Sequence, residues 1–377
     1  MKILVLSNYY PEHSGGIEVV AQNLVSQYRS NGNQVRWIAC DIRQAPHIPH
    51  PDDHPLKCLN FAEDRLGFPY PLPGPGSLPA IYRDVGWCDV LHLHDCLYAA
   101  NVLAFVCSRI RKKPVLVTQH VAAVAYPQKY KKVLQDLAYR SLGKMLIRRA
   151  ERVVFVNPAV RGWFAGFVAF RRQAINLPNG CDTRLFHPVE SKERRDYRLK
   201  LGLPVDRPVF IFVGRFIEKK GIRIVRQLVA ENPDVYWVLV GRQGDDDPRR
   251  WKGDNFRVIE SLPQISLREY YWAAHLLVLP SHGEGFPLVV QEAMACGTAA
   301  LISCETFDAL RDQNAPLFRA PLSYPEFSQR IDRILANREA LDAMRSEAAR
   351  YAASSWSWEA AAREYISILD QVRVERS

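Results

Sequence analysis

The amino-acid sequence predicts an α/β protein that consists of two doubly wound domains, each built on a parallel sheet. The chain has 377 residues, which exceeds the ~250–300 residues at which one hydrophobic core stops growing. Short runs such as residues 3–6 and 210–213 are apolar without alternation, which is typical of parallel strands covered on both faces. Strand-length runs and helix-length amphipathic stretches alternate in two separate series, which favours two sheets over one long sheet.

The first series of predicted strands begins at residue 2. After its first strand, residues 18–30 place Val20, Leu24 and Tyr28 on one helical face. A turn signal at residues 177–180 ends the series, so the predicted domains are 1–180 and 181–356. The predicted strands of the first domain are residues 2–7, 34–40, 89–94, 114–120 and 152–157.

The second series follows a charged stretch at residues 190–200. Residues 222–230 have the periodicity of an amphipathic helix, and the tail after Tyr351 is helical apart from an interruption at residues 354–358. The predicted strands of the second domain are residues 209–214, 235–241, 256–259, 276–280 and 299–303.

One segment of the first domain breaks the alternation. Residues 46–79 contain nine prolines, and they predict a long loop inserted in the domain rather than a linker between domains. The loop is either an irregular surface excursion or a lip over a pocket.

Composition points to a protein made and kept in the cytoplasm. No apolar run reaches the ~18–20 residues of a transmembrane helix, and the apolar stretch at residues 1–7 is too short for a signal peptide. Eight cysteines include no C-x-x-C pair, so no disulfide framework is expected. The net charge of +10 favours anionic partners, namely nucleic acid, acidic lipid surfaces or phosphorylated small molecules.

A basic loop stands where the first strand of the second domain meets its helix. Gly214 and Gly221 allow backbone N–H groups to approach a ligand, and a helix N-terminus favours an anion. Arg215 offers a planar fork for phosphate and Lys220 a compact positive charge. Two cations at one strand–helix junction suit a diphosphate. The alternative is a solvated basic loop.

Two glutamates are eight residues apart, at Glu284 and Glu292. Eight residues are about two helical turns, so Glu292 lies on the helix face below the loop that holds Glu284. One carboxylate in the loop and one on the helix can bind two hydroxyl-bearing groups of an extended ligand. The backbone amides of Gly285 and Phe286 remain available to an anion.

At these positions the chain resembles the retaining glycosyltransferases of family four over essentially its whole length. That family has the GT-B architecture, in which two Rossmann-like domains face each other across a cleft. The interruption at residues 356–358 also resembles the point where the family's C-terminal helix, here residues 357–377, returns to complete the first domain. The residues that carry the resemblance are Gly15-Gly16-Ile17-Glu18, Thr118-Gln119-His120, Pro178-Asn179-Gly180-Cys181-Asp182, Gly214-Arg215 with Lys220-Gly221, and Glu284 with Glu292 after Pro280-Ser281.

The resemblance implies a site for a nucleotide diphosphate sugar in the second domain and for an acceptor in the first. Arg215 and Lys220 would hold the diphosphate, Glu292 the ribose hydroxyls, and Glu284 the sugar ring. His120 would line the cleft near the sugar, although a strand-end histidine can also be purely structural. The implied catalytic residues are Glu284, Arg215, Lys220 and His120. The implied donor-binding residues are Gly15, Gly16, Gly214, Arg215, Lys220, Glu284, Gly285, Phe286, Pro287 and Glu292.

The implied reaction is transfer of a hexose with retention of configuration. A UDP-sugar is the favoured donor and a GDP-sugar the next, with a glycan or lipid-linked acceptor in cell-surface polysaccharide or lipopolysaccharide synthesis. Retention would follow a front-face displacement in which the leaving phosphate takes the acceptor proton, or a covalent glycosyl-enzyme. No cofactor is required beyond the donor.

Two metal-like patterns are interpreted otherwise. Residues 245–247 contain D-x-D, but they stand in a polar loop and are predicted to be solvated. His92 and His94 share one strand face, yet no obvious third ligand accompanies them, although Asp95 and the histidines at 47–54 remain alternatives. No metal site is therefore predicted.

The positive charge concentrates at residues 129–149. Seven cations crowd a stretch in which Val133, Leu134 and Leu137 recur at helical spacing. This pattern predicts either a basic amphipathic helix on an anionic membrane or a core-packing helix with a solvated basic face. The basic run at residues 111–113 favours the membrane, so a peripheral contact at its inner face is expected.

Two other function classes fit parts of the sequence. An isomerase or hydrolase of nucleotide sugars would use the same donor site without an acceptor. A membrane-surface or nucleic-acid binding module would need no catalysis. Nucleic acid is not expected as a partner, because the clearest cations stand in a phosphate-binding loop rather than among aromatic residues.

Overall fold

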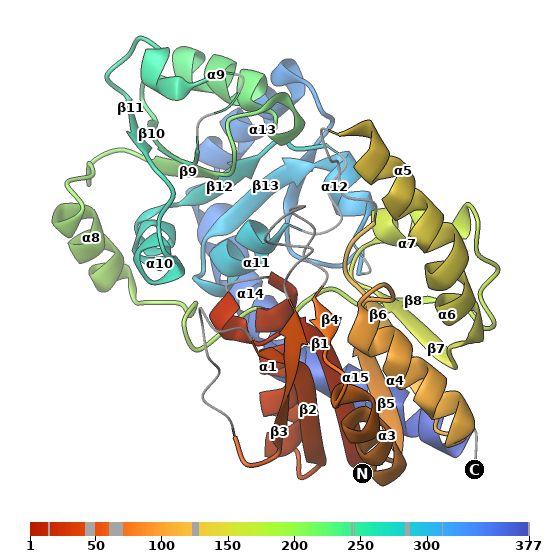
Figure 1. The fold of residues 1–377 in the computed structure, drawn as a ribbon. Helices are drawn as coiled ribbons and strands as arrows, with labels where there is room; N and C mark the ends of the chain where they lie inside the picture. The colour runs from red at the N-terminus through yellow and green to blue at the C-terminus, as the bar shows by residue number, and fades with distance from the viewer. Residues whose placement is uncertain are drawn as a thin grey trace. The chain divides into compact units, whose positions relative to one another are not determined.

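The computed structural model describes residues 1–13, 16–41, 50–59, 71–122, 128–242, 244, 246–282, 287–310 and 312–375. Contacts divide the chain into two compact units (Figure 1). Unit 1 comprises Met1–Asn179 and Trp358–Ser377, and unit 2 comprises Gly180–Ser357. Each unit is built on one sheet with helices packed against it, as the alternation in the sequence predicts.

Unit 1 contains an eight-stranded sheet in the order β4-β3-β2-β1-β5-β6-β7-β8. All neighbours in it are parallel except β3 and β4. All five predicted strands of the first domain are present, as β1, β2, β5, β6 and β7. The strands are β1 Lys2–Tyr9, β2 Gln34–Asp41, β3 Asp53–Leu59, β4 Leu72–Pro73, β5 Val90–His94, β6 Val115–Gln119, β7 Arg152–Phe155 and β8 Ile175–Asn176.

Helices cover both faces of the unit 1 sheet. Side chains such as Ile3 and Val5 pack with α1 and α15 on one face, whereas Leu4 and Leu6 pack with α3 and α4 on the other. This alternation is what a strand buried on both faces requires. The helices are α1 Gly16–Ser30, α3 Ser77–Trp87, α4 Ala99–Ile110, α5 Lys129–Ala138, the π-helix η2 Tyr139–Gly143, α6 Lys144–Arg149, α7 Pro158–Ala165 and α15 Trp358–Val374, after the 3-10 turn η1 Pro11–His13.

Unit 2 contains a six-stranded parallel sheet in the order β11-β10-β9-β12-β13-β14. The five predicted strands of the second domain are β9 to β13, and β14 adds a short edge. The strands are β9 Val209–Val213, β10 Tyr236–Val240, β11 Phe256–Ile259, β12 Leu276–Leu279, β13 Ala299–Ser303 and β14 Phe318–Ala320.

One hydrophobic cluster forms the core of unit 2 and includes the fully buried strands β9 and β12. The charged stretch before β9 forms α8, which begins with a capping box between Glu190 and Glu193. The helices are α8 Ser191–Lys200, α9 Ile222–Glu231, α10 Gln264–Ala273, α11 Leu288–Ala295, α12 Cys304–Asp308, α13 Tyr324–Ala336 and α14 Arg338–Ser355, with 3-10 turns η3 Glu218–Lys220 and η4 Pro248–Arg250.

The prediction of a continuous loop at residues 46–79 is wrong for its described parts. They contain β3, β4 and the first turn of α3. Proline has no N–H group to donate to the hydrogen-bond ladder of a sheet, so it is tolerated near a sheet edge rather than at its centre. Pro55 lies in β3 and Pro73 in the edge strand β4, which is the location that this rule allows. Residues 46–49 and 60–70 are outside the described residues.

Cys40 and Cys58 form a disulfide that joins β2 to the neighbouring β3. The sequence predicted no disulfide framework, and the structure contains this one bond. The two cysteines are 18 residues apart in sequence but 5.7 Å apart between Cα atoms, because the register of β2 with β3 sets Cys40 opposite Leu56. The other six cysteines are free thiols, and five of them are buried.

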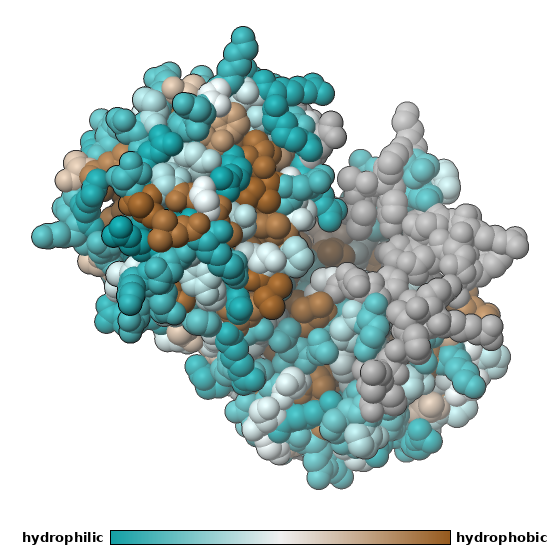
Figure 2. All heavy atoms as spheres, turned by 90° about the vertical axis from the view of Figure 1, so that its left-hand side faces the viewer, coloured by the Kyte–Doolittle hydropathy of each residue, from teal (hydrophilic) through white to brown (hydrophobic). Residues whose placement is uncertain are grey.

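Across the described ranges, no helix has the length and apolar character needed to cross a bilayer. On the face of the molecule shown in Figure 2, hydrophilic residues cover most of the surface and hydrophobic residues form separate small patches.

Candidate functional site

The candidate donor site lies at the carboxyl edge of the unit 2 sheet. There β9 and β12 are neighbours, so the loop after β9 and the loop after β12 leave the sheet side by side. The two loops touch, because the His282 backbone N–H donates to the Lys219 carbonyl oxygen at 3.0 Å. Ligands of open α/β sheets bind outside the carboxyl ends of the strands, so this edge is the place to look for a ligand.

Gly221 makes the close approach of the two loops possible. Its φ of +73° lies in the left-handed region, and it is the residue before α9. A Cβ at this position would lie 1.9 Å from the carbonyl oxygen of Pro280. Glycine alone satisfies both demands. Packing therefore requires glycine at position 221, whereas the neighbouring Lys220 is explained by its positive charge.

The cations predicted for the diphosphate lie together on the loop after β9. Arg215 is exposed and Lys220 is half-buried. A Cβ built on Gly214 would meet Cγ and Cδ of Lys220 at 3.6 Å, so the lysine stem lies across Gly214. The structure thus brings Gly214, Arg215 and Lys220 into one short, positively charged segment.

Two glycines that the sequence reasoning missed pack against this segment. A Cβ on Gly241 would lie 1.9 Å from the Gly214 carbonyl oxygen, and one on Gly244 would lie 2.2 Å from the Phe216 carbonyl oxygen. The loop after β10 therefore fixes the backbone on both sides of Arg215. The signal available in the sequence was one glycine at the end of a predicted strand and a second glycine three residues later.

Glu292 is buried on α11 and its carboxylate has two partners from α10. Gln264 donates through Nε2 to Oε1 at 2.9 Å, and the Tyr271 hydroxyl donates to Oε2 at 3.1 Å. Only 6% of the Glu292 surface is exposed. We call these three side chains the carboxylate cradle. Gln264 and Tyr271 were not predicted, because only tertiary packing brings α10 against α11.

Burial raises the pKa of Glu292, while the hydrogen bonds from Gln264 and Tyr271 lower it in part. The same burial raises the pKa of Tyr271 well above its usual range. Tyr271 is therefore a neutral donor at physiological pH. A carboxylate held by two donors on one helix can still accept hydrogen bonds from a hydroxyl-bearing ligand.

Several predicted site residues lie outside the described residues, namely Gly15, Glu284, Gly285 and Phe286. Pro287 is described, is buried, and caps the N-terminus of α11. Asp245 is also outside the described residues.

The neighbours of Asp245 are paired with protein groups. Asp246 accepts from Trp251 Nε1 at 2.8 Å and pairs with Arg226 at 3.4 Å. Asp247 accepts from the backbone N–H of Arg249 at 3.1 Å and pairs with its guanidinium at 2.9 Å. Among the residues that the structure describes, no group of three or more His, Cys, Asp or Glu side chains could hold a metal ion.

The carboxyl edge of the unit 1 sheet carries buried neutral histidines. His94, at the end of β5, and His120, just after β6, lie side by side with His94 Nδ1 and His120 Nε2 2.9 Å apart. Burial lowers the pKa of His120 to about 3 and that of His94 well below its usual value. Both rings are therefore neutral at physiological pH.

Asp95, which follows His94 and which the sequence analysis considered only as an alternative metal ligand, has an unusual environment. Its φ is +67°, a left-handed conformation that costs a non-glycine residue ~1–2 kcal/mol. Its Oδ1 accepts from the His120 backbone N–H at 3.2 Å and from Gln119 Nε2. Within the described residues, Asp95 Oδ2 and His94 Nε2 are buried without a hydrogen-bond partner. Burial raises the pKa of Asp95 to about 7.

His92 has a structural role. Its Nε2 lies 2.8 Å from Thr118 Oγ1 and its Nδ1 lies 3.2 Å from the Tyr28 hydroxyl. Thr118 Oγ1 in turn donates to the hydroxyl of Tyr365 on α15 at 3.4 Å. Both ring nitrogens of His92 are thus hydrogen-bonded inside the core.

Gly16 begins α1. A Cβ built on it would meet nothing within 4 Å. The space beside the first turn of α1 is therefore open to a ligand, but the packing of the described residues does not require glycine at this position.

The basic segment at 129–149 is helical; the apolar side chains of α5 face outward, whereas Leu146 and Ile147 on α6 are buried. Val133, Leu134 and Leu137 on α5 are 68%, 56% and 62% exposed, whereas the polar Gln135 is 3% exposed. Of the two alternatives for this stretch, the core-packing helix is therefore wrong for α5. Exposed cations accompany Val133, Leu134 and Leu137 at Lys132, Arg140, Lys144, Arg148 and Arg149. We call these eight side chains the α5–α6 surface.

Comparison with solved structures identifies the architecture. The chain matches Anabaena Alr3699/HepE, solved in complex with UDP, with a TM-score of 0.69 and 17% identity over 98% of this chain and 100% of that chain. It matches sucrose-phosphate synthase from Thermosynechococcus elongatus with a TM-score of 0.67 and 21% identity over 100% of both chains. Two parallel-sheet units of this kind form the GT-B fold, and the class is that of the GT-B glycosyltransferases.

Sequence comparison then identifies the family. The model described as "Glycosyl transferases group 1" matches residues 193–351, and the model described as "Glycosyltransferase Family 4" matches residues 14–185. The chain belongs to the group 1 glycosyltransferases. A phosphatidyl-myo-inositol mannosyltransferase of Mycolicibacterium smegmatis is 27% identical over 82% of this chain and 78% of its own length. An alpha-maltose-1-phosphate synthase of the same organism is 25% identical over 80% of each.

Proposed function

We propose that the protein transfers a hexose from a nucleotide diphosphate sugar to a glycan or lipid-linked acceptor, with retention of configuration. The observation that carries the proposal is the carboxyl edge of unit 2. There the exposed Arg215 and the half-buried Lys220 share one short loop with Gly214, and α11 next to it holds the buried carboxylate of Glu292. A nucleotide diphosphate sugar needs cations that bind its diphosphate and a hydrogen-bond acceptor for its ribose hydroxyls.

The charges at this edge fit the chemistry of the transfer. When the anomeric C–O bond breaks, its electron pair goes to the leaving diphosphate and positive character develops on the sugar. Arg215 and Lys220 would stabilise the diphosphate, and losing one such contact typically costs ~3–4 kcal/mol. We favour a front-face displacement in which the acceptor oxygen bonds to the same face of the anomeric carbon and its proton passes to the leaving phosphate. Glu284 would contact the sugar ring.

The neutral edge of unit 1 suits the hydroxyls of the acceptor and of the sugar. His120 uses Nε2 for His94, so its Nδ1 would meet a sugar hydroxyl. Asp95 Oδ2 and His94 Nε2 are buried and lack a partner in the described part of the chain, and an acceptor hydroxyl would satisfy one or both. Gly16, with open space beside it, would let backbone amides approach the donor.

The donor base is proposed to be uracil, with guanine next. The structure of Anabaena Alr3699/HepE holds UDP, and the mycobacterial relative is named as a mannosyltransferase that uses phosphatidyl-myo-inositol. We propose a cell-surface polysaccharide or lipopolysaccharide acceptor, a cytoplasmic location, and no metal requirement.

A thermal-shift screen followed by product analysis tests the proposal. UDP, GDP and their sugars should raise the melting temperature selectively, because a ligand at 100 times its Kd stabilises the fold by ~2.7 kcal/mol. With donor and acceptor together, the product should carry the sugar in the donor's anomeric configuration. Stabilisation by no nucleotide diphosphate would overturn the donor site. Rapid conversion of donor alone, with no transfer, would favour the isomerase or hydrolase class.

We further propose that the α5–α6 surface contacts an anionic membrane. The observation that favours this is the outward apolar face of α5, because a helix that only packed in a core would expose Gln135 and bury Leu134. Beside this face, a surface hollow of about 450 Å³ is lined by Ser141, Lys144, Met145, Arg148 and Arg149. Apolar side chains would enter the interface while the cations met lipid phosphates.

Co-sedimentation with phosphatidylglycerol vesicles tests the membrane contact. Leu134→Ser/Leu137→Ser should weaken binding strongly, because burying each leucine contributes ~1.5–3 kcal/mol. Leu199→Ser is the matched control, since Leu199 is 61% exposed on α8 of unit 2. Binding that is equal in all three proteins, or absent in wild type at low salt, would leave α5 without this role.

A further inference from the structure

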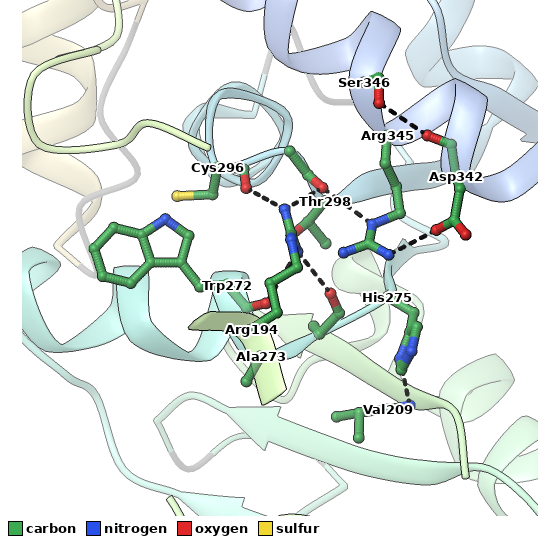
Figure 3. A network of polar contacts seen from close by, with 12 residues as sticks. Arg194, Val209, Trp272, Ala273, His275, Cys296, Thr298, Asp342, Arg345 and Ser346 are labelled. Carbon is green, nitrogen blue, oxygen red and sulfur yellow. Dashed lines mark hydrogen bonds and ion pairs between the residues drawn. The ribbon is translucent and has the colours of Figure 1, made fainter. Parts of the chain in front are cut away.

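A single buried guanidinium joins the C-terminal ends of the two helices that form the carboxylate cradle (Figure 3). Arg194, from α8, donates through Nη1 to the Trp272 carbonyl oxygen at 2.9 Å, which belongs to the last turn of α10. Through Nη2 it donates to the carbonyl oxygens of Cys296 and Gly297, both at 2.7 Å, just after α11 ends. Its planar fork therefore spans both helix ends.

The neighbouring arginines each reach only one of these helices. Arg198 donates through Nε to the Ala273 carbonyl oxygen at 2.8 Å, at the end of α10. Arg345 donates to the Gly297 carbonyl oxygen at 3.2 Å, after α11, and pairs with Asp342 at 2.9 Å. Among the three cations, Arg194 alone bridges α10 and α11, which makes the other two natural controls.

Three features of the environment of Arg194 favour this contact. Burial lowers the pKa of its guanidinium to about 9, which leaves it charged at physiological pH. Carbonyl oxygens at a helix C-terminus carry partial negative charge and are stabilised by a cation. Gly297, with a φ of +68°, allows the approach, because a Cβ there would lie 2.7 Å from Nη2 of Arg194.

The bridged ends lie close in sequence to the residues of the cradle. Tyr271, which donates to Glu292, directly precedes Trp272, and its own carbonyl oxygen accepts a hydrogen bond from Thr298 Oγ1. Glu292 lies one turn before Cys296, whose N–H donates to the Glu292 carbonyl oxygen at 3.1 Å. A shift of α10 against α11 at this end would therefore move Tyr271 relative to the Glu292 carboxylate.

We propose that Arg194 is a positioning residue for nucleotide binding, because its bridge between α10 and α11 sets the orientation of the Glu292 carboxylate. The inference rests on the proposed role of Glu292 toward the donor ribose. Arg194 touches no ligand itself. Its contribution is to hold the two sides of the cradle at the spacing that leaves Glu292 able to accept from the ribose hydroxyls.

A double-mutant cycle tests the proposal by isothermal titration of the full-length protein with UDP and with GDP. Lysine is the chosen replacement, because Arg194→Lys keeps the buried charge but one ammonium cannot span both helix ends. In otherwise wild-type protein it should raise the nucleotide Kd about tenfold. In the Glu292→Gln background the same change should raise Kd less than about twofold, because the group that Arg194 positions is already lost.

Arg198→Lys is the control and should change the nucleotide Kd less than about twofold. Turnover with saturating donor should fall much less than donor KM rises in Arg194→Lys. Thermal unfolding of each variant shows whether it is folded. Arg194→Met, which removes the charge as well as the bridge, is the second variant at this position. An equal effect of Arg194→Lys with and without the Glu292 carboxylate, or an equal effect of Arg198→Lys, would overturn the proposal.

The same experiment separates this inference from the proposed function. If neither nucleotide binds wild type, or if Glu292→Gln leaves Kd unchanged, the ribose role of Glu292 is wrong. If Glu292→Gln weakens binding and Arg194→Lys does not, only the positioning role fails.

Discussion

The carboxyl edges of the two sheets handle charge in opposite ways. The edge of unit 2 presents exposed or half-buried cations on a glycine-rich loop and one buried carboxylate whose oxygens already accept two hydrogen bonds. The edge of unit 1 buries His94 and His120 as neutral rings, and it holds Asp95 in a left-handed conformation with one carboxyl oxygen that has no hydrogen-bond partner among the described residues. The same type of sheet thus supports two different polar environments.

The contrast teaches that the local packing of an edge, and not the sheet itself, determines which ligand charge it can accept. Cations near solvent can bind a diphosphate at modest desolvation cost, whereas buried neutral groups favour hydroxyls. In a glycosyl transfer the donor brings the negative charge and the acceptor brings the hydroxyl. The predictions that follow test whether the two edges divide the work in this way.

The largest expected effect is on the charged edge. Lys220→Ala should lower turnover by about 10²–10³-fold with little change in stability, because a half-buried cation acts on the leaving diphosphate. Lys219→Ala is the matched control and should retain activity, since the neighbouring Lys219 is exposed. Steady-state kinetics at saturating donor measure both. Wild-type turnover in a folded Lys220→Ala protein would show that the phosphate assignment is wrong.

Acid should destabilise unit 1 more than unit 2. Burial lowers the pKa of His92, His94 and His120, so the stability that their neutral forms contribute is present above pH ~6.5 and is lost as pH falls toward 3. Each such histidine contributes up to ~1.4 kcal/mol per pH unit. The raised pKa of Asp95 acts in the opposite direction, but it offsets only one of the three.

In unit 2 the pKa shifts of two buried groups oppose each other. The pKa of His275 is lowered by burial and that of Glu292 is raised by burial, so their contributions to the pH dependence have opposite signs. Urea unfolding at pH 6.5 and pH 4.5, resolved by hydrogen exchange mass spectrometry with correction for intrinsic rates, should show unit 1 losing more stability. Equal losses in the two units would contradict the assigned protonation states.

A smaller effect is expected from replacing Asp95, whose Oδ2 has no hydrogen-bond partner among the described residues. Asp95→Asn should raise the KM for the acceptor roughly fivefold, because it replaces a charged hydrogen bond by a neutral one at a cost of about 1 kcal/mol. The Kd for the nucleotide should not change, since the proposed nucleotide site is in unit 2. Asp89→Asn is the matched control, because Asp89 lies at the other end of β5, where it accepts from the Lys2 backbone N–H at 2.7 Å. A rise in nucleotide Kd without an acceptor effect would reverse the division of labour.

The smallest effect should come from chelation. EDTA is expected to leave transfer unchanged, because Asp246 and Asp247 are already paired with Arg226 and Arg249. Activity assays with EDTA, and with Mn²⁺ added back, measure this. Complete loss that Mn²⁺ restores would return the D-x-D pattern at 245–247 to consideration.

The fold could be predicted from the sequence because its signals are local. Ten apolar runs in the sequence correspond to ten of the strands in the structure. Glu292 is conspicuous in the sequence because it interrupts an apolar helix. The strand β3 was missed because its proline is a signal against a strand, and only the edge position of this region permits it.

The partners of site residues could not be predicted, because they depend on which helices pack together. Gln264 and Tyr271 are 28 and 21 residues from Glu292 and contact it only through the packing of α10 on α11. Periodicity identified the apolar face of α5 correctly but could not tell whether that face points inward. A helix has the same hydrophobic pattern whether the apolar face meets a core or a membrane.

The C-terminal helix has a consequence for synthesis of the protein. α15 supplies Trp358, Tyr365 and Leu369 to the core of unit 1, against strands that are made more than two hundred residues earlier. During synthesis, all residues of unit 2 are therefore made before α15, the helix that packs on one face of the unit 1 sheet. A chain released before α15 is made would contain all residues of unit 2 but would leave an open apolar surface on unit 1, which is a target for chaperones and proteases.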